Sequence, residues 1–143
     1  MDKIVFICTG NTCRSPMAEG LFKAMDGENK TGLKAVSAGV FTVDNLPASE
    51  YAITASGELG ADISNHKSQV INDSIINDAK YIVCMTASHY DKILEKYPDV
   101  NDKLFTLMPA DVDDPYGGTL DDYRKCASQI QKGISSIIER LKK

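Results

Sequence analysis

The sequence predicts an α/β fold: a three-layer sandwich in which a central four-stranded parallel sheet carries helices on both faces. Short runs of consecutive apolar residues alternate with helical patterns along the 143 residues. This alternation is typical of a parallel sheet whose strands are buried on both sides. In such sheets ligands bind beyond the carboxyl ends of the strands, so a functional site is expected in the loops at those ends.

Two strands and two helices are expected in the first half of the chain. Ser15 suits a helix N-cap and Pro16 the first helical position, and Gly27 can end that helix. Gly60 is placed to stop the second helix. The expected order is a strand at 3–8, a helix that starts at 16, a strand at 33–38 and a helix at 47–59.

The same alternation continues in the second half. Pro98 ends a helix, because proline disfavours the helical conformation of the residue before it. Thr119 caps the last helix, with Asp122 three residues later. The expected order is one helical turn near 72–78, a strand at 81–85, a helix at 87–97, a strand at 104–107, a Pro/Gly/Asp loop at 108–118 and a long final helix.

Composition predicts one compact domain over residues 1–143, because the chain shows no internal repeat, low-complexity tract or linker. The net charge of −4 argues against a nucleic-acid partner, since proteins that bind nucleic acid usually carry a basic face. No signal peptide is recognisable, and no stretch approaches the roughly 18 apolar residues of a membrane helix. We therefore expect a cytoplasmic monomer without a membrane partner.

The four cysteines are expected to be reduced thiols, because disulfides are rare in the cytoplasm. Cys84 lies in an apolar run and Cys126 in a helical pattern. Both are best interpreted as small buried hydrophobic residues. Cys8 and Cys13 differ, because they belong to a segment with a specific spacing.

This segment predicts a phosphate-binding loop after the first strand. A cysteine ends the strand, five residues follow, then an arginine, and then the Ser-Pro opening of a helix. Five residues suffice to curl the backbone so that its N–H groups point inward beside a helix N-terminus, which favours an anion. Gly10 and Asn11 tolerate the positive φ that this curl demands. The segment is Cys8-Thr9-Gly10-Asn11-Thr12-Cys13-Arg14-Ser15.

The chemistry of this loop points to Cys8 as a nucleophile. Arg14 can bind two phosphate oxygens at once. The surrounding dipoles are expected to lower the pKa of Cys8 below the value of about 8.5 for a free thiol, and a thiolate beneath a phosphoryl group is placed for in-line attack. The alternative is a buried strand cysteine before an ordinary turn. Other phosphate motifs, such as a P-loop or a dinucleotide fingerprint, are absent from the sequence.

A thiolate that attacks a phosphoryl group predicts a cysteine-dependent phosphatase. Such an enzyme also needs an acid for the leaving group and later a base for water. Asp114 is the candidate, because Pro115 stiffens the backbone after it and two glycines let the loop approach the site. The alternative is a solvated acidic turn. A zinc site made of Cys8, Cys13 and a histidine lacks the usual paired ligand spacing, so no metal or other cofactor is expected.

These residues resemble the low-molecular-weight protein-tyrosine phosphatase family over essentially the whole chain. The match comprises C-x-G-N-x-C-R-S-P from Cys8, the turn at 37–39, the segment 62–66 and Asp114-Pro before an aromatic residue. The resemblance implies a metal-free, two-step reaction on phosphorylated proteins. In it Cys8 is the nucleophile, Arg14 binds phosphate, and Asp114 is first acid and then base.

The resemblance also implies supporting roles. Ser15 would donate a hydrogen bond to the Cys8 sulfur, and Asn11, Ser37 and His66 would hold the loop in its curl. The alternatives for these three are a turn asparagine, a strand-end serine and a satisfied core histidine. His89, on an expected helix, is interpreted as a surface or packed residue. After oxidation, Cys13 could trap a Cys8 sulfenic acid as a reversible disulfide.

The substrate depends on Thr12 and Tyr116. Thr12, where tyrosine-specific members commonly carry a bulkier aliphatic residue, resembles the bacterial branch that acts on phosphoarginine, as does the Asp-Pro-aromatic-Gly-Gly pattern. Thr12 offers an oxygen to a guanidinium, which is planar and rich in donors. Tyr116 could stack on the guanidinium of phosphoarginine or on the ring of phosphotyrosine. Phosphoarginine is therefore favoured, with phosphotyrosine as the alternative.

Three other functions remain as alternatives. An arsenate reductase on the same fold would need a downstream pair of shuttle cysteines, but Cys84 is followed seven positions later by Asp91. A phosphocarrier subunit would need neither Arg14 nor an Asp-Pro acid. A non-catalytic phosphate-binding module would not be expected to retain Cys8, Arg14 and Asp114 together.

Overall fold

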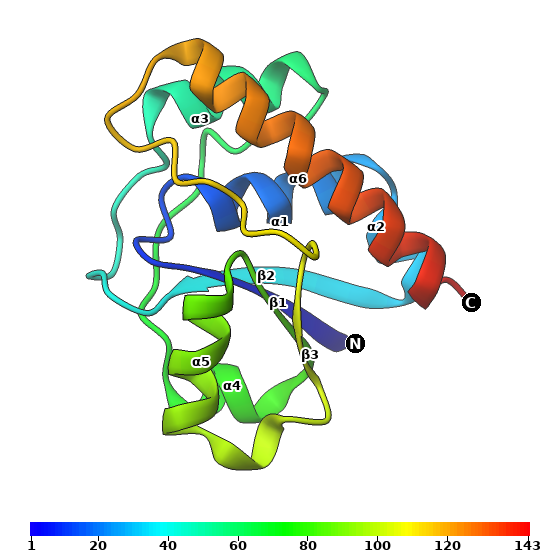
Figure 1. The fold of residues 1–143 in the computed structure, drawn as a ribbon. Coiled ribbons are helices and arrows are strands. Elements are labelled where there is room, and N and C mark those ends of the chain that lie inside the picture. Colours follow the sequence, from blue (N-terminus) through cyan, green and yellow to red (C-terminus); the bar gives the residue numbers. More distant parts are fainter.

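The computed structural model describes residues 1–143 and contains one sheet of four parallel strands (Figure 1). The strand order is β2-β1-β3-β4, so β1 lies inside the sheet. β1 pairs with β2 along its whole length, from Asp2 opposite Leu33 to Cys8 opposite Gly39. The predicted fold class is confirmed. The strands are β1 Asp2–Cys8, β2 Leu33–Gly39, β3 Ala79–Cys84 and β4 Leu104–Thr106.

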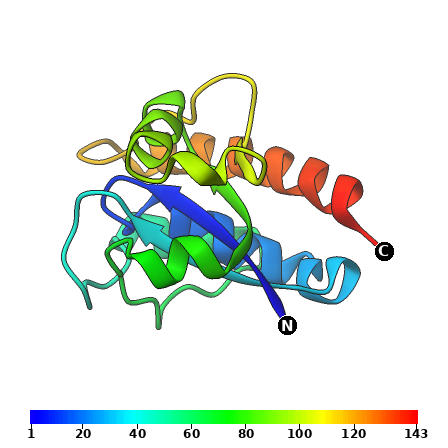
Figure 2. The same cartoon turned by 90° about the horizontal axis from the view of Figure 1, so that it is seen from below.

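Helices cover both faces of this sheet (Figures 1 and 2). Side chains of β1 point alternately to the two faces: Ile4 and Phe6 join the larger apolar cluster, and Val5 and Ile7 join the smaller one. The larger cluster is completed by α1 Arg14–Ala24, α3 Glu50–Glu58 and α6 Leu120–Leu141, with the short α2 Gly27–Thr31 packed beside α6. The smaller one is completed by α4 Asp73–Asp78 and α5 Ala87–Lys96.

Several helix ends differ from the sequence prediction. Cys13, not Ser15, is the N-cap of α1 and makes no side-chain capping bond. Ser15 lies in the first turn instead, because its hydroxyl contacts the sulfur of Cys8. α1 ends at Ala24, and Gly27 begins the short α2, which the sequence pattern did not reveal. The helix expected at 47–59 begins at Glu50, since Ser49 is its N-cap and accepts from the Ala52 N–H.

Other boundaries agree with the prediction. Thr119 and Asp122 form a reciprocal capping box at the start of α6. α5 ends before Pro98, which opens the short 3₁₀ turn η1 Pro98–Val100. None of the helices is long and apolar enough to cross a membrane.

The segment between β4 and α6 is held beside the end of β3. The Leu107 N–H donates to the Cys84 carbonyl at 2.9 Å, and the Val112 N–H donates to the Met85 carbonyl at 3.0 Å. These bonds fix the backbone just before Asp114. They therefore bring the Asp-Pro segment to the same edge of the sheet as the loop that follows β1.

Candidate active site

The loop from Cys8 to Arg14 leaves the carboxyl end of β1 and packs against the end of β2. The Val40 N–H donates to the Cys8 carbonyl and the Phe41 N–H donates to the Thr9 carbonyl, each at 3.0 Å. Gly39 is required at this contact, because a Cβ there would lie 2.6 Å from the Thr9 carbonyl oxygen. The turn at 37–39 is thus shaped by the close approach of the loop.

The curl of the loop depends on Asn11, which adopts a left-handed conformation with φ of 56°. Its side-chain amide donates to Ser15 Oγ at 2.8 Å and to Ser37 Oγ at 2.9 Å. Its side-chain oxygen accepts from the Gln69 N–H at 2.9 Å, and its backbone oxygen lies 2.7 Å from Nε2 of His66. Three separate segments therefore hold this one residue, and Asn11 itself is fully buried.

Ser15 links this network to the sulfur of Cys8. Because the Asn11 amide nitrogen is a donor, Ser15 Oγ accepts there and keeps its own hydrogen for another partner. Cys8 Sγ lies 2.8 Å from Ser15 Oγ. The sulfur also accepts from the Asn11 N–H at 3.3 Å. Both contacts favour the thiolate form of Cys8 at the base of the loop.

Burial has the opposite effect on Cys8. It is the largest influence, and it raises the pKa of the thiol above its ordinary value. The Ser15 hydroxyl and N–H, the Arg14 charge and the Asn11 N–H all lower that pKa. The sequence-based expectation of a lowered pKa considered only these favourable groups, because the sequence did not reveal that Cys8 is only 2% exposed.

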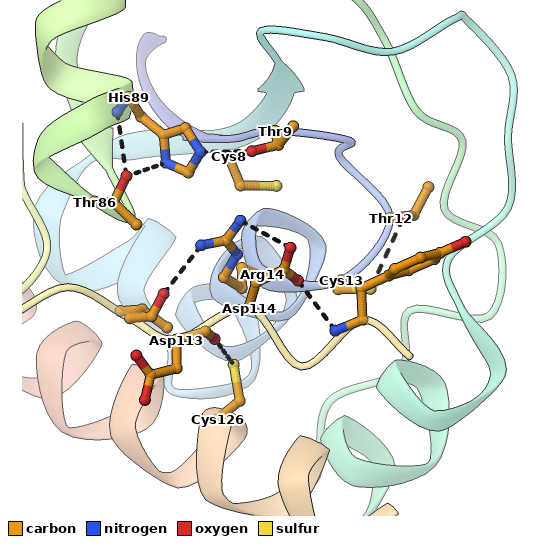
Figure 3. Close-up of polar contacts among 12 residues, drawn as sticks. Cys8, Thr9, Thr12, Cys13, Arg14, Thr86, His89, Asp113, Asp114 and Cys126 are labelled. Atoms are coloured by element: carbon orange, nitrogen blue, oxygen red, sulfur yellow. Dashed lines mark hydrogen bonds and ion pairs between the residues drawn. The ribbon is translucent and has the colours of Figure 1, made fainter. Parts of the chain in front are cut away.

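Arg14 connects the loop to the Asp-Pro segment (Figure 3). Its side chain is buried, and Nη1 donates to the Val112 carbonyl at 3.0 Å. Nη2 lies 3.6 Å from Oδ2 of Asp114, whose side chain is 54% exposed. The other oxygen of Asp114 accepts from the Tyr116 N–H at 3.1 Å. Asp114 thus stands at the rim, where a leaving group and solvent can both reach it.

The loop and the Asp-Pro segment enclose an open pocket of about 720 Å³. Cys8 and Arg14 contribute to its wall, with Thr12 beside them and Asp114 at its edge. Phe41 and Tyr116 also line it and are strongly exposed, at 82% and 79%. Its shape suits a small anionic group at the base with a longer side chain projecting past aromatic rings.

The remaining cysteines are free thiols in different surroundings. Cys13 Sγ lies 3.3 Å from Oγ of Ser49, the N-cap of α3, and 3.5 Å from the hydroxyl of Tyr123 in α6. Cys84 and Cys126 are buried, and burial raises the pKa of each thiol to about 12. The expectation that these two behave as small hydrophobic residues is confirmed.

His89 is the site residue that sequence reasoning did not identify. It is buried, as the packed alternative expected, but its Nε2 lies 2.8 Å from Thr9 Oγ1 in the loop. The signal was present in the pattern Thr86-x-x-His89, because a threonine N-cap fixes the residue three positions later in the first helical turn. No group of three metal-ligating side chains includes His66 or His89, so the zinc alternative has no ligand set.

Comparison with known proteins identifies the family. Residues 3–143 match the family model described as low molecular weight phosphotyrosine protein phosphatase. A protein-arginine-phosphatase of Geobacillus stearothermophilus is 35% identical, with 97% of this chain and 95% of that protein covered. A solved YwlE arginine phosphatase from the same organism superposes with a TM-score of 0.89 over 99% of this chain and 93% of that one.

Two further relatives show the range of names in this group. A low molecular weight protein tyrosine phosphatase from T. tengcongensis is 38% identical, with a TM-score of 0.89 over 99% of this chain and all of that one. An arsenate reductase of Staphylococcus aureus is 37% identical over 94% of this chain and 95% of its own length. The family model spans nearly every residue, and the fold and loop geometry agree with it. The chain belongs to the low molecular weight phosphotyrosine protein phosphatase family.

Proposed function

We propose that this protein removes phosphoryl groups from proteins through a covalent phosphocysteine on Cys8, with phosphoarginine as the preferred substrate. The observation that carries this proposal is the position of Cys8 Sγ, which lies beneath the loop within 2.8 Å of the Ser15 hydroxyl. Arg14 and Asp114 stand over the same pocket. Together these groups provide a nucleophile, an anion-binding cation and an acid.

In the first step, the Cys8 thiolate attacks phosphorus and forms the S–P bond as the P–N bond of phosphoarginine breaks. Arg14 and the loop N–H groups bind the phosphoryl oxygens as negative charge moves onto them. Asp114 gives its proton to the departing guanidine nitrogen, so arginine leaves in a protonated, stable form. The Asp114 carboxylate that results stands beside the leaving cation.

In the second step, Asp114 takes a proton from water, and the water oxygen attacks the same phosphorus. The S–P bond breaks, inorganic phosphate forms, and the electron pair returns to sulfur. The Ser15 hydroxyl stabilises this thiolate as it leaves. Asp114 is again protonated, so the cycle is complete without a metal ion or an external reductant.

The substrate preference is supported by Thr12 and by the arginine phosphatase relative. Thr12 is partly exposed on the pocket wall and offers a hydroxyl rather than an apolar surface. Phosphotyrosine is the second candidate, because the exposed rings of Phe41 and Tyr116 flank the pocket and could contact a phenyl group. Arsenate reduction would need a pair of shuttle cysteines, and this chain lacks one. Cys84 is fully buried in β3, and Asp91 stands where the second cysteine would be.

The test compares kcat/KM for one peptide that carries phosphoarginine and its phosphotyrosine counterpart, with Cys8→Ser as the blank. We expect kcat/KM for the phosphoarginine peptide to be tenfold or more higher, which corresponds to about 1.4 kcal/mol or more in transition-state binding. Thr12→Ile should reduce that ratio. A preference for phosphotyrosine would reject the substrate assignment and keep the Cys8 chemistry. Turnover at the level of the blank on both peptides would reject the phosphatase assignment.

We also propose a cytoplasmic monomer that recognises phosphorylated proteins and neither nucleic acid nor membrane. All four cysteines are free, which fits a reducing compartment. Each group used in the two steps comes from a single chain. Light scattering at assay concentrations tests the oligomeric state, and a mass of two chains would reject this part of the proposal.

A further inference from the structure

His89 connects a helix end to the wall of the pocket. The residue is 3% exposed and lies in the first turn of α5. Nε2 is 2.8 Å from Thr9 Oγ1, and Nδ1 is 3.0 Å from Thr86 Oγ1 (Figure 3). Thr9 follows Cys8 directly and lines the pocket. A chain of polar contacts therefore runs from Thr86 through His89 to Thr9.

The direction of these hydrogen bonds follows from the helix cap. The His89 backbone N–H donates to Thr86 Oγ1 at 3.1 Å, so this oxygen acts as an acceptor there. The Thr86 hydroxyl hydrogen needs its own acceptor, and Nδ1 of His89 lies at 3.0 Å. A neutral imidazole that accepts at Nδ1 carries its hydrogen on Nε2. Nε2 therefore donates to Thr9 Oγ1.

His89 is neutral in its surroundings. The pKa of His89 is lowered to about 4, mainly by burial and in smaller part by the nearby charges of Arg14 and Lys92. Asp111 and Asp114 act in the opposite direction but more weakly. Near pH 7 the ring thus has one donor and one acceptor, as the assignment requires.

This direction leaves the Thr9 hydroxyl hydrogen free. Thr9 Oγ1 accepts from His89 and makes no other hydrogen bond within the protein. With the opposite tautomer, Thr9 would donate to His89 and turn oxygen lone pairs toward a bound anion. The tautomer of His89 therefore decides whether the pocket wall next to Cys8 attracts or repels a phosphoryl oxygen.

We propose that His89 is a positioning residue that makes the Thr9 hydroxyl a hydrogen-bond donor to a phosphoryl oxygen bound above Cys8. The inference rests on the proposed function, because it requires an anionic phosphoryl group in this pocket. It adds one side-chain donor to Arg14 and the loop N–H groups. His89 itself does not touch the substrate.

Two measurements on the whole protein test this inference. Nitrogen-15 NMR of the imidazole should show hydrogen on Nε2 of His89 at pH 7. Calorimetric titration with inorganic phosphate should show binding weaker by at least about tenfold for Thr9→Val, the lower end of the loss expected for a hydrogen bond to a charged group. Thr9→Ser should retain the affinity. Thr54→Val, on the exposed face of α3, is the matched control and should bind like the wild type.

A double-mutant cycle tests the coupling. His89→Asn keeps a polar group near Nδ1 but is too short to reach Thr9, so it should weaken phosphate binding by a similar factor. Thr9→Val combined with His89→Asn should cause little further loss. His89→Gln, whose amide nitrogen can take the place of Nε2, should restore much of the affinity. Each phosphate titration needs no turnover.

Several results would overturn the inference. These are hydrogen on Nδ1, unchanged phosphate binding in Thr9→Val, fully additive losses in the double variant, or no phosphate binding by the wild type. If His89→Asn does not fold, the wild-type tautomer and the Thr9→Val titration still decide. Expected phosphate binding without hydrolysis of either phosphopeptide would reject the proposed function and retain the inference.

Discussion

Replacing Ser15 by alanine is expected to raise the pKa of the Cys8 thiol. The Ser15 hydroxyl lies 2.8 Å from Cys8 Sγ and accepts from Asn11, so its hydrogen faces the sulfur. This contact opposes the effect of burial on the pKa of Cys8. A hydrogen bond to a charged group contributes about 1.5–3 kcal/mol. Loss of this bond destabilises the Cys8 thiolate relative to the thiol by that order, so the pKa of Cys8 should rise in Ser15→Ala.

The rate of alkylation by iodoacetate as a function of pH measures this change. Mass spectrometry of the Cys8 peptide separates it from Cys84 and Cys126, whose thiols burial keeps protonated with pKa values of about 12. Ser74→Ala is the matched control, because Ser74 is exposed and its hydroxyl donates a hydrogen bond to Asp78 on the surface. An unchanged midpoint in Ser15→Ala would show that the hydroxyl does not donate to the sulfur.

The same substitution has a kinetic consequence. Cys8 leaves as a thiolate in the second step, and a thiol of higher pKa is a poorer leaving group. Hydrolysis of the phosphocysteine should therefore become rate-limiting in Ser15→Ala. Rapid mixing with an aryl phosphate should show a burst of product followed by slow turnover. A lower rate without a burst would place the effect in the first step and contradict the leaving-group argument.

Three other perturbations have clear expected outcomes. Asp114→Asn should lower kcat on a phosphoarginine peptide about 100-fold or more, because no acid protonates the leaving nitrogen; unchanged kcat would exclude Asp114 as the acid. Gly39→Ala places a Cβ 2.6 Å from the Thr9 carbonyl, so phosphate affinity and kcat/KM should fall, whereas Gly57→Ala meets no atom within 4 Å and should not change them. Acidification should destabilise the fold through His89, whose pKa of about 4 lies below its ordinary 6.5. Below pH 6.5 the folded state binds fewer protons at His89 than the unfolded state does. The stability that neutral His89 contributes is therefore complete above about pH 6.5 and is lost as pH falls through 4, to a total of about 3 kcal/mol. Urea titrations from pH 7 to 4 measure it, and an equal loss in His89→Asn would assign it to other groups.

The sheet could be predicted because its strands are buried on both faces. Such strands read as continuous apolar runs, and residues 4–8 of β1 are all nearly inaccessible. The capping box at Thr119 could also be predicted, because both of its partners lie within one helical turn of the sequence. In contrast, local rules predict that Gly27 stops a helix, because glycine often has that role. Here it begins α2, and a Cβ would meet the Phe22 carbonyl oxygen at 2.6 Å.

The Ser15 misassignment has a functional origin. Ser-Pro is a common helix opening, and Ser15 followed by Pro16 favoured an N-cap by local rules. In the structure the hydroxyl contacts Cys8 and Asn11 instead, while Cys13 takes the N-cap position without a side-chain bond. The helix thus begins without its usual cap, and the serine supports the sulfur. A local rule fails here because the same residue is part of the site.

Contacts between distant positions lie beyond local spacing rules. His89 contacts Thr9 across 80 positions, and His66 contacts Asn11 across 55. A spacing rule detects partners within one helix turn or strand, so the pattern alone predicts the loop. The support from Ser37 and His66 is implied only by the family resemblance, and the contact from His89 is predicted by neither. The pKa of Cys8 has the same origin: the dipoles that lower it are local, and the burial that raises it comes from the whole fold. Burial is the larger influence on the pKa of Cys8, and comparison of the pH profiles of the wild type and Ser15→Ala measures how much the Ser15 hydroxyl offsets it.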